Sequence, residues 1–297
     1  MLSSFQAKKK KKMNQIDILK WFLRVGITDC IGEIPMNRFQ MAIKQTKNQS
    51  DRIMTQALQS LKSQPIQSQV ILNKEIISSE SEVSFLTQAT QLAQSAVDLT
   101  SLKNALNQFE GCSLKKTAVH TLDGMGQTNR PDVLCLIDTP KSDDEKNGQL
   151  AGGDSGTLLL KMLKAIQLDC NENTYLAPVI PWRLPGDRKP TVTESELCLP
   201  FLKRRIELLQ PHFILILGSL PLKILLDIDS ISKARLQELF YQLSNGTTVP
   251  VVATFGPDSV KKAQTYRANA WTDLQKLQKM IHNYYNNKQK EEKNAGY

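Results

Sequence analysis

The sequence predicts an α/β protein, a three-layer α/β/α sandwich built on a central sheet of four parallel strands. Two observations lead to this prediction. Four short apolar runs have the length of buried strands, and amphipathic stretches of helical length separate them. Strands that alternate with helices pair in parallel through right-handed crossovers, with helices on both faces of the sheet.

The chain before this domain is expected to add little to the core. Residues 1–14 are predicted to be a basic disordered tail, because consecutive lysines repel one another and bury nothing. Residues 15–95 contain a short amphipathic helix, Gln15–Val25, followed by a linker rich in Gln, Ser and Lys. We place the folded domain at residues 96–285 and a flexible tail at residues 286–297.

The elements of the domain follow in chain order. The apolar runs that predict strands are Val133–Ile137, Tyr175–Ile180, Phe213–Leu217 and Val249–Thr254. The stretches that predict helices are Thr157–Ile166, Glu194–Leu209, Leu220–Phe240 with a break, and Asn269–Tyr285. In such a sheet the loops after the carboxyl ends of the strands form the site, so the loops to examine begin at Asp138, Pro181, Gly218 and Phe255.

The excess of basic residues favours a polyanionic partner, but it is unevenly distributed. The chain has 38 Lys and Arg against 29 Asp and Glu, a net charge of +9. Five of these charges come from Lys8–Lys12 and one from residues 288–297, which leaves +3 for residues 13–287. No apolar run approaches the ~20 residues that cross a bilayer, and the basic amino terminus lacks a small-residue cleavage site. Together with five scattered cysteines, this predicts a cytoplasmic protein with no membrane partner.

Ordered motifs fill the predicted loops and the elements around them. Residues Val133–Leu168 read VLCLIDTPKSDDEKNGQLAGGDSGTLLLKMLKAIQL, and residues Pro181–Pro190 read PWRLPGDRKP. Matching segments follow at Thr193–Leu209, Phe213–Gly218 and Val251–Leu274, the last with a W-x-D-L ending. In this order the motifs resemble the family 4 uracil-DNA glycosylases. GITDCIGEIP and FEGCSLKKTA look like the bacterial members with an extra leading segment.

The resemblance implies a base excision repair hydrolase with the uracil-DNA glycosylase fold and with DNA as its partner. Such an enzyme extrudes the base, stacks it on an aromatic ring and reads its edge by hydrogen bonds. A carboxylate positions the attacking water, and a donor stabilises the departing anion. A basic groove holds the phosphates.

Compared position by position, the resemblance implies that most of these groups are missing. The motif G-E-A-P-G corresponds to Ile137–Lys141, so the carboxylate survives only as Asp138, and Lys141 adds a side chain where the family has glycine. The stacking aromatic corresponds to Ala151, the base-reading asparagine to Pro178, and the histidine to Gly256. We therefore take Asp138 as the candidate catalytic residue and expect the pocket at Thr139, Pro140, Ala151, Pro178 and Gly256.

The resemblance also implies an iron–sulfur site. The four cysteine positions that hold a four-iron cluster in the family correspond to Phe109, Cys112, Trp182 and Cys198. Two thiolates cannot hold this cluster in the usual way. We expect neither a metal nor an iron–sulfur cluster, and we interpret Cys112 and Cys198 as small buried apolar residues.

Basic residues in two loops are the candidate DNA contacts. They are Arg183, Arg188 and Lys189 after the second strand, and Lys261 and Lys262 after the last strand. The alternative is an ordinary solvated surface. We interpret the acids of residues 143–145 as solvated, and Gly153-Asp154-Ser155-Gly156 as a helix start capped by Asp154 or Ser155.

These observations predict a uracil-DNA glycosylase-like protein that binds DNA and has lost most or all of its uracil excision, a pseudo-enzyme. The first alternative is an active DNA glycosylase that uses Asp138 as its base, on uracil or another damaged base. The second is a scaffold whose partner is a protein. All three remain open from the sequence.

Overall fold

A computed structural model of the chain describes residues 83–295. The expected tail at residues 1–14, the helix Gln15–Val25 and most of the expected linker lie outside the described residues.

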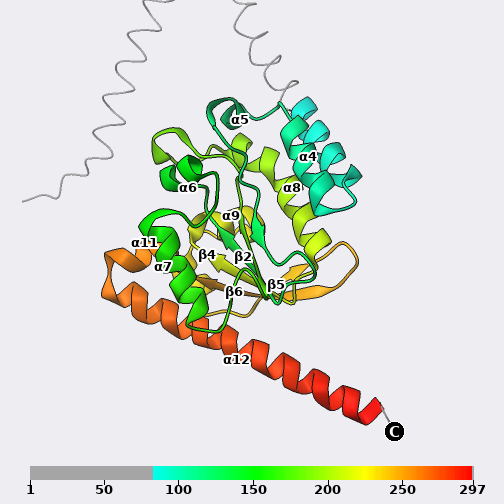
Figure 1. Ribbon diagram of the computed structural model, residues 1–297, viewed down its shortest axis with the longest axis vertical. Helices are drawn as coiled ribbons and strands as arrows, with labels where there is room; N and C mark the ends of the chain where they lie inside the picture. The colour runs from blue at the N-terminus through cyan, green and yellow to red at the C-terminus, as the bar shows by residue number, and fades with distance from the viewer. Residues whose placement is uncertain (1–82, 296–297) are drawn as a thin grey trace, which may run out of the picture. The chain divides into compact units, whose positions relative to one another are not determined.

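Six strands form one mixed sheet (Figure 1) in the order β1-β3-β2-β4-β6-β5. The strands are β1 (Met125–Gly126), β2 (Val133–Ile137), β3 (Thr174–Pro178), β4 (Phe213–Leu217), β5 (Leu239–Gln242) and β6 (Thr248–Thr254). The four central strands are parallel and coincide with the four predicted runs, which confirms the predicted core of the sheet. The edge strands β1 and β5 pair antiparallel, so the sheet is not purely parallel.

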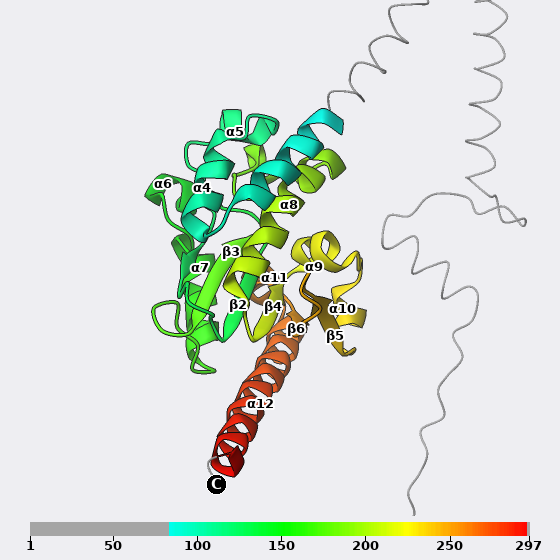
Figure 2. The ribbon, with the colours of Figure 1, turned by 90° about the vertical axis from the view of Figure 1, so that its right-hand side faces the viewer.

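Helices cover both faces of the sheet (Figures 1 and 2), which confirms the three-layer arrangement. One face carries α4 (Leu99–Gln108), α8 (Val192–Leu209), α9 (Ser219–Leu226) and α10 (Ile231–Ala234). The other carries α7 (Gly153–Lys164) and the first half of α12 (Gln264–Ala295). The loops hold α5 (Ser113–Thr117), α6 (Ser142–Asn147), the 3₁₀ turn η1 (Pro185–Asp187) and α11 (Pro257–Lys262).

The period-two alternation of the strands divides the core between the two faces. In β2, Leu134 and Leu136 pack toward α4 and α8, whereas Val133 and Cys135 pack toward α7 and α12. All four side chains are fully buried. Because both faces are covered, the central strands are continuous apolar runs, which is why they were the easiest elements to predict.

The predicted boundary between the linker and the folded domain, at residue 96, lies too late in the chain. Residues 83–95 are helical, and Ala89, Ala93 and Ala96 are buried in the same core cluster as α4 and α8. Arg204 on α8 donates two hydrogen bonds, of 3.0 and 2.8 Å, to the carbonyl oxygen of Ala96. Ala89 and Ala93 are four residues apart, so they lie on one helical face and let the helix pack closely, and Ala96 follows just after the helix end. The folded domain therefore includes residues before 96.

The expected helix at Leu220–Phe240 is only partly correct. It divides into α9 and α10, and its end becomes the edge strand β5. In β5 burial alternates along Leu239–Gln242, and a hairpin joins the strand to β6, with the Leu243 N–H donating to Thr247 at 2.8 Å. The turn contains Asn245-Gly246, a hairpin signal that the helical interpretation overlooked.

The carboxyl-terminal end of the chain also differs from the expectation of a flexible tail. Helix α12 continues to Ala295 and extends beyond the sheet (Figures 1 and 2). Its residues 286–291 are exposed. No helix within residues 83–295 is long and apolar enough to span a membrane.

A buried ion pair joins the end of the sheet to the helices beside it. Arg235, just after α10, donates to both carboxylate oxygens of Asp273 on α12, at 2.8 and 3.0 Å. The Thr254 hydroxyl at the end of β6 donates to the same carboxylate at 2.6 Å. A buried charge requires such partners. The network joins the end of β6 and the residue after α10 to the body of α12.

Candidate functional site

The candidate site is a cavity of about 120 Å³ at the carboxyl edge of the central sheet. Its walls come from the ends of three parallel strands, where Asp138 follows β2, Gly218 follows β4 and Gly256 follows β6. Ala151 and Ser155, at the start of α7, close another side. We call it the Asp138 cavity. Its position is the one predicted for a site in a parallel α/β sheet.

The structure brings together four of the six pocket residues predicted from the sequence. Asp138, Thr139, Ala151 and Gly256 line the Asp138 cavity. The other two predicted positions, Pro140 and Pro178, are buried and do not line it. Pro178 is the last residue of β3 and is paired in register with Ile137, so it belongs to the buried end of the sheet and not to the cavity wall.

Asp138 is the carboxylate best placed for chemistry. Its Oδ1 is shielded from solvent and has no hydrogen-bond partner among the described residues. Burial raises the pKa of Asp138 to about 6; repulsion from Asp258 adds to the effect, and attraction to Lys141 opposes it. At neutral pH most of this carboxyl is therefore ionised and able to accept a proton.

Two glycines make room for this arrangement. Gly218 has φ +112°, and a Cβ there would lie 2.8 Å from Asp138 Oδ1. A Cβ on Gly156 would lie 2.0 Å from the Ala151 carbonyl carbon, so this glycine lets the loop before α7 pack directly on the helix. Both residues line the cavity.

Asp144 holds the loop that frames the cavity. It is buried, and its carboxylate accepts the Lys141 N–H at 2.8 Å and the Gly152 N–H at 2.6 Å. The expectation that the acids of residues 143–145 are solvated is therefore wrong for Asp144. A short acid in the first turn of a helix satisfies free backbone N–H groups, and here it clamps both ends of one loop.

A second acid, Asp258, organises polar side chains at the mouth of the cavity. It accepts a hydrogen bond of 2.5 Å from the Ser155 hydroxyl and pairs with the Lys141 ammonium at 3.4 Å. Lys261 in turn donates to Ser155 at 3.0 Å. Although burial opposes it, the Ser155 hydrogen bond and the nearby lysines lower the pKa of Asp258. Ser155 serves this network and does not cap α7, whose N-cap is Gly152.

The predicted DNA contacts fall into two groups. Arg183 and Arg188 have acidic partners: Arg183 pairs with Glu145 at 3.2 Å, and Arg188 binds both oxygens of buried Glu194, at 2.8 and 2.6 Å. The Arg188 hydrogen bond lowers the pKa of Glu194. These two arginines therefore brace the second loop.

The predicted lysines are the more available contacts. Lys189, Lys261 and Lys262 are exposed, and none of them forms a salt bridge within the described part of the chain. Lys261 is the nearest to the Asp138 cavity because it reaches Ser155 at the mouth. The loop and the helix α11 thus present ammonium groups that have no acidic salt-bridge partner in the described residues.

The four positions that correspond to cluster ligands lie together but do not suit a cluster. Phe109, Cys112, Trp182 and Cys198 are all fully buried in one core cluster. Phe109 packs on Phe201 with ring centroids 5.5 Å apart, and the Trp182 indole donates to Thr121 at 3.1 Å. The Cys198 thiol hydrogen-bonds to Cys112, which lowers the pKa of Cys112. Two aromatic rings thus occupy positions that a four-iron cluster needs for thiolates.

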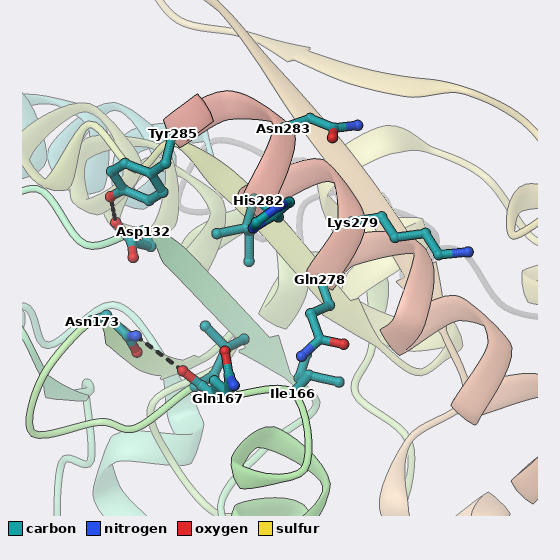
Figure 3. Close-up of a pocket in the computed structure, with 11 residues that line it drawn as sticks. Asp132, Ile166, Gln167, Asn173, Gln278, Lys279, His282, Asn283 and Tyr285 are labelled. Carbon is teal, nitrogen blue, oxygen red and sulfur yellow. Dashed lines mark hydrogen bonds between the residues drawn. The ribbon is translucent and has the colours of Figure 1, made fainter. Parts of the chain in front are cut away.

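A larger cavity, of about 560 Å³, lies at the opposite edge of the sheet (Figure 3). In Figure 3 the Tyr285 hydroxyl points at Asp132, and the Asn173 amide donates to the Gln167 carbonyl oxygen at 3.1 Å. None of the residues predicted to act in the site lines this cavity. The site assignment therefore stays with the carboxyl edge.

Replacing Asp138 by Asn should stabilise the protein more at neutral than at acid pH. Because its folded pKa, about 6, exceeds the ordinary 3.8, ionising Asp138 costs folding free energy. Its contribution to stability is full below about pH 4 and is lost as the pH rises through about 6. The stability difference between variant and wild type should therefore grow by roughly 2 kcal/mol between about pH 4.5 and about pH 7.5. Urea unfolding at about pH 4.5 and about pH 7.5 measures it.

The matched control is Asp229→Asn, since the Asp229 side chain is 82% exposed and should show no such growth. An equal stability difference for Asp138→Asn at both pH values would contradict the raised pKa.

Comparison with known proteins identifies the family of the chain. The family model described as the uracil DNA glycosylase superfamily matches residues 124–275, about half of the chain, and the match includes every strand end that builds the Asp138 cavity. The Type-4 uracil-DNA glycosylase of Archaeoglobus fulgidus is 28% identical over 170 residues, covering 56% of this chain and 84% of the relative. That of Pyrobaculum aerophilum is 24% identical over 182 residues, covering 60% and 92%. A DNA polymerase of Bacillus phage SP01 is 23% identical over 169 residues, which cover 57% of this chain and 18% of the polymerase.

Proposed function

Because the chain belongs to the uracil-DNA glycosylase superfamily, we propose that it binds DNA at the carboxyl edge of its sheet and excises uracil at a strongly reduced rate. The observation that carries this proposal is the composition of the Asp138 cavity. One carboxylate remains at Asp138, but Ala151 and Gly256 stand where the family resemblance places an aromatic ring and an imidazole. No aromatic or histidine side chain of the described residues lines the cavity.

Each missing group has a known cost. Loss of a preorganised donor toward developing negative charge slows such reactions by roughly 10²–10³-fold. Loss of one base–aromatic stack removes about 1–3 kcal/mol, or roughly 5-fold to 150-fold. Together these losses amount to at least about 10³-fold in the rate of uracil excision, while the phosphate contacts that hold DNA are unaffected.

A second candidate function is that of an active DNA glycosylase with Asp138 as its base. It is favoured by the free Oδ1 of Asp138 and by its pKa of about 6, which suit a group that takes a proton from water. The substrate would then be uracil or another deaminated or damaged base that needs no aromatic stack. Hypoxanthine is a suitable second substrate for the test.

Single-turnover excision separates the two candidates. With enzyme in excess over a uracil-containing single strand, the full chain should react at least about 10³-fold more slowly than the Archaeoglobus fulgidus relative. Any remaining excision should disappear in Asp138→Asn. A rate on uracil or hypoxanthine that equals the relative's rate on uracil would contradict the reduced-rate proposal and support the second candidate.

We further propose that Lys261 and Lys262 contact DNA phosphates. Replacing both by Gln should reduce the slope of log affinity against log salt by about 1.4, since each single-strand phosphate contact contributes about 0.7. Fluorescence anisotropy on the full chain measures it. Because Lys8–Lys12 are present in both proteins, the difference belongs to α11.

The control for this measurement is Lys164→Gln, which should leave the slope unchanged. Lys164 is exposed and lies at the end of α7 that is farther from the Asp138 cavity. An unchanged slope in the Lys261/Lys262 variant would mean that these lysines are a solvated face. Full-chain binding that depends only on Lys8–Lys12 would favour the protein-interaction scaffold.

We also infer that the chain works without a four-iron cluster. Phe109 and Trp182 are buried side chains with their own packing and hydrogen-bond partners, and two cysteines are too few for the usual ligand set. Iron and acid-labile sulfide analysis of the anaerobically purified full chain should find neither in stoichiometric amounts. About four irons per chain, lost on Cys112→Ala, would contradict this inference.

A further inference from the structure

The Asp138 cavity contains an unusual balance of charge. Three carboxylates, those of Asp138, Asp144 and Asp258, line it, and Lys141 is the one cationic side chain among the described residues that do so. Lys261 reaches the mouth only through Ser155. The family resemblance places a glycine at the position of Lys141, so the lysine side chain is expected to obstruct the pocket. The structure shows instead that the side chain turns to the rim of the cavity.

Lys141 is held at both ends. Its backbone N–H donates to the buried Asp144 carboxylate at 2.8 Å, which fixes the start of the side chain at the N-cap of α6. Its ammonium lies 3.4 Å from Asp258 Oδ2, and the other oxygen of Asp258 accepts from Ser155. The Lys141 side chain is 42% exposed, so the charge stands at the mouth of the cavity, where a base would enter or leave.

The Lys141 ammonium lies near the position of the missing histidine. Asp258 is two residues after Gly256, the position that corresponds to the family's histidine. Lys141 therefore brings a positive charge to the side of the cavity from which the imidazole is missing. We infer that Lys141 faces the leaving base and stabilises its anion, and that Asp258 is the positioning residue for Lys141.

This inference rests on the proposed residual excision and explains where it comes from. The bond between the base nitrogen and C1′ of the sugar breaks, and its electron pair leaves with the base as an anion beside the Lys141 ammonium. A water molecule forms the new bond to C1′, and its proton passes to the Asp138 carboxylate. The substrate class is a base whose anion is stable enough to leave without a stacking ring.

The test compares leaving groups of different stability under single-turnover conditions. Full-length Lys141→Gln should excise uracil about 10²-fold more slowly than the wild type. It should lose less on 5-fluorouracil, because fluorine already stabilises the departing anion. Lys141→Arg, which keeps the charge, should stay within about 10-fold of the wild type. Asp258→Asn should fall between them, because it frees the ammonium without removing it.

The matched control is Lys146→Gln, on the same helix, with a side chain that is 73% exposed and lies outside the cavity lining. It should leave both rates and the thermal unfolding midpoint unchanged. Because the Lys141 side chain is also partly exposed, Lys141→Gln should keep its midpoint as well.

Three results would overturn the inference. Equal rates for Lys141→Gln and wild type on both bases would show that the ammonium does not act. Equal losses on both bases, together with weaker DNA binding, would make Lys141 a phosphate contact. A wild type that binds the oligonucleotides but excises neither base would overturn this inference and leave DNA binding intact, whereas absence of DNA binding would overturn the proposed function itself.

Discussion

Parallel pairing of the four central strands is the constraint on which the site depends. β2 pairs with β3 on one side and β4 on the other, and β4 pairs with β6, all in the same direction. Their carboxyl ends therefore meet at one edge, and Asp138, Gly218 and Gly256 come together although they are far apart in the chain. The helices on both faces fix this edge by burying every central strand, and the Arg235–Asp273 pair fixes the exit from β6.

The polar groups of the cavity have divided roles. The Asp144 carboxylate accepts the backbone N–H groups of Lys141 and Gly152 and so holds the loop between them. Asp258 is paired with Ser155 and Lys141. Asp138 alone has a carboxylate oxygen that is buried and without a partner in the described structure. Burial is the main cause of the raised pKa of Asp138, and repulsion from the nearby Asp258 carboxylate adds to it. This division leaves Asp138 as the one carboxylate of the cavity that is available for the proposed chemistry.

The sequence predicts the central sheet well because its strands are apolar runs buried on both faces. It predicts the edge strands poorly: β1 has two residues and β5 is half exposed, so both depend on pairing that only the folded chain provides. Motif order predicts Asp138, Thr139, Ala151 and Gly256 in the site. It misplaces Pro140 and Pro178, and it misses the link from Lys141 to Asp258, because loop conformation brings these two residues together. The acidic run at residues 143–145 does not indicate that Asp144 is buried, because only the conformation of the loop brings its carboxylate inside.

We propose that Asp138 is the one carboxylate that carries out chemistry in a retained but altered site. The pH dependence of single-turnover uracil excision between about pH 5 and about pH 8 tests it most directly. Because the base must be ionised, the rate should rise with pH, reach half its maximum near pH 6 and then level off. A measurable rate that does not change across this range, or that Asp138→Asn leaves as it is, would show that Asp138 is not the base.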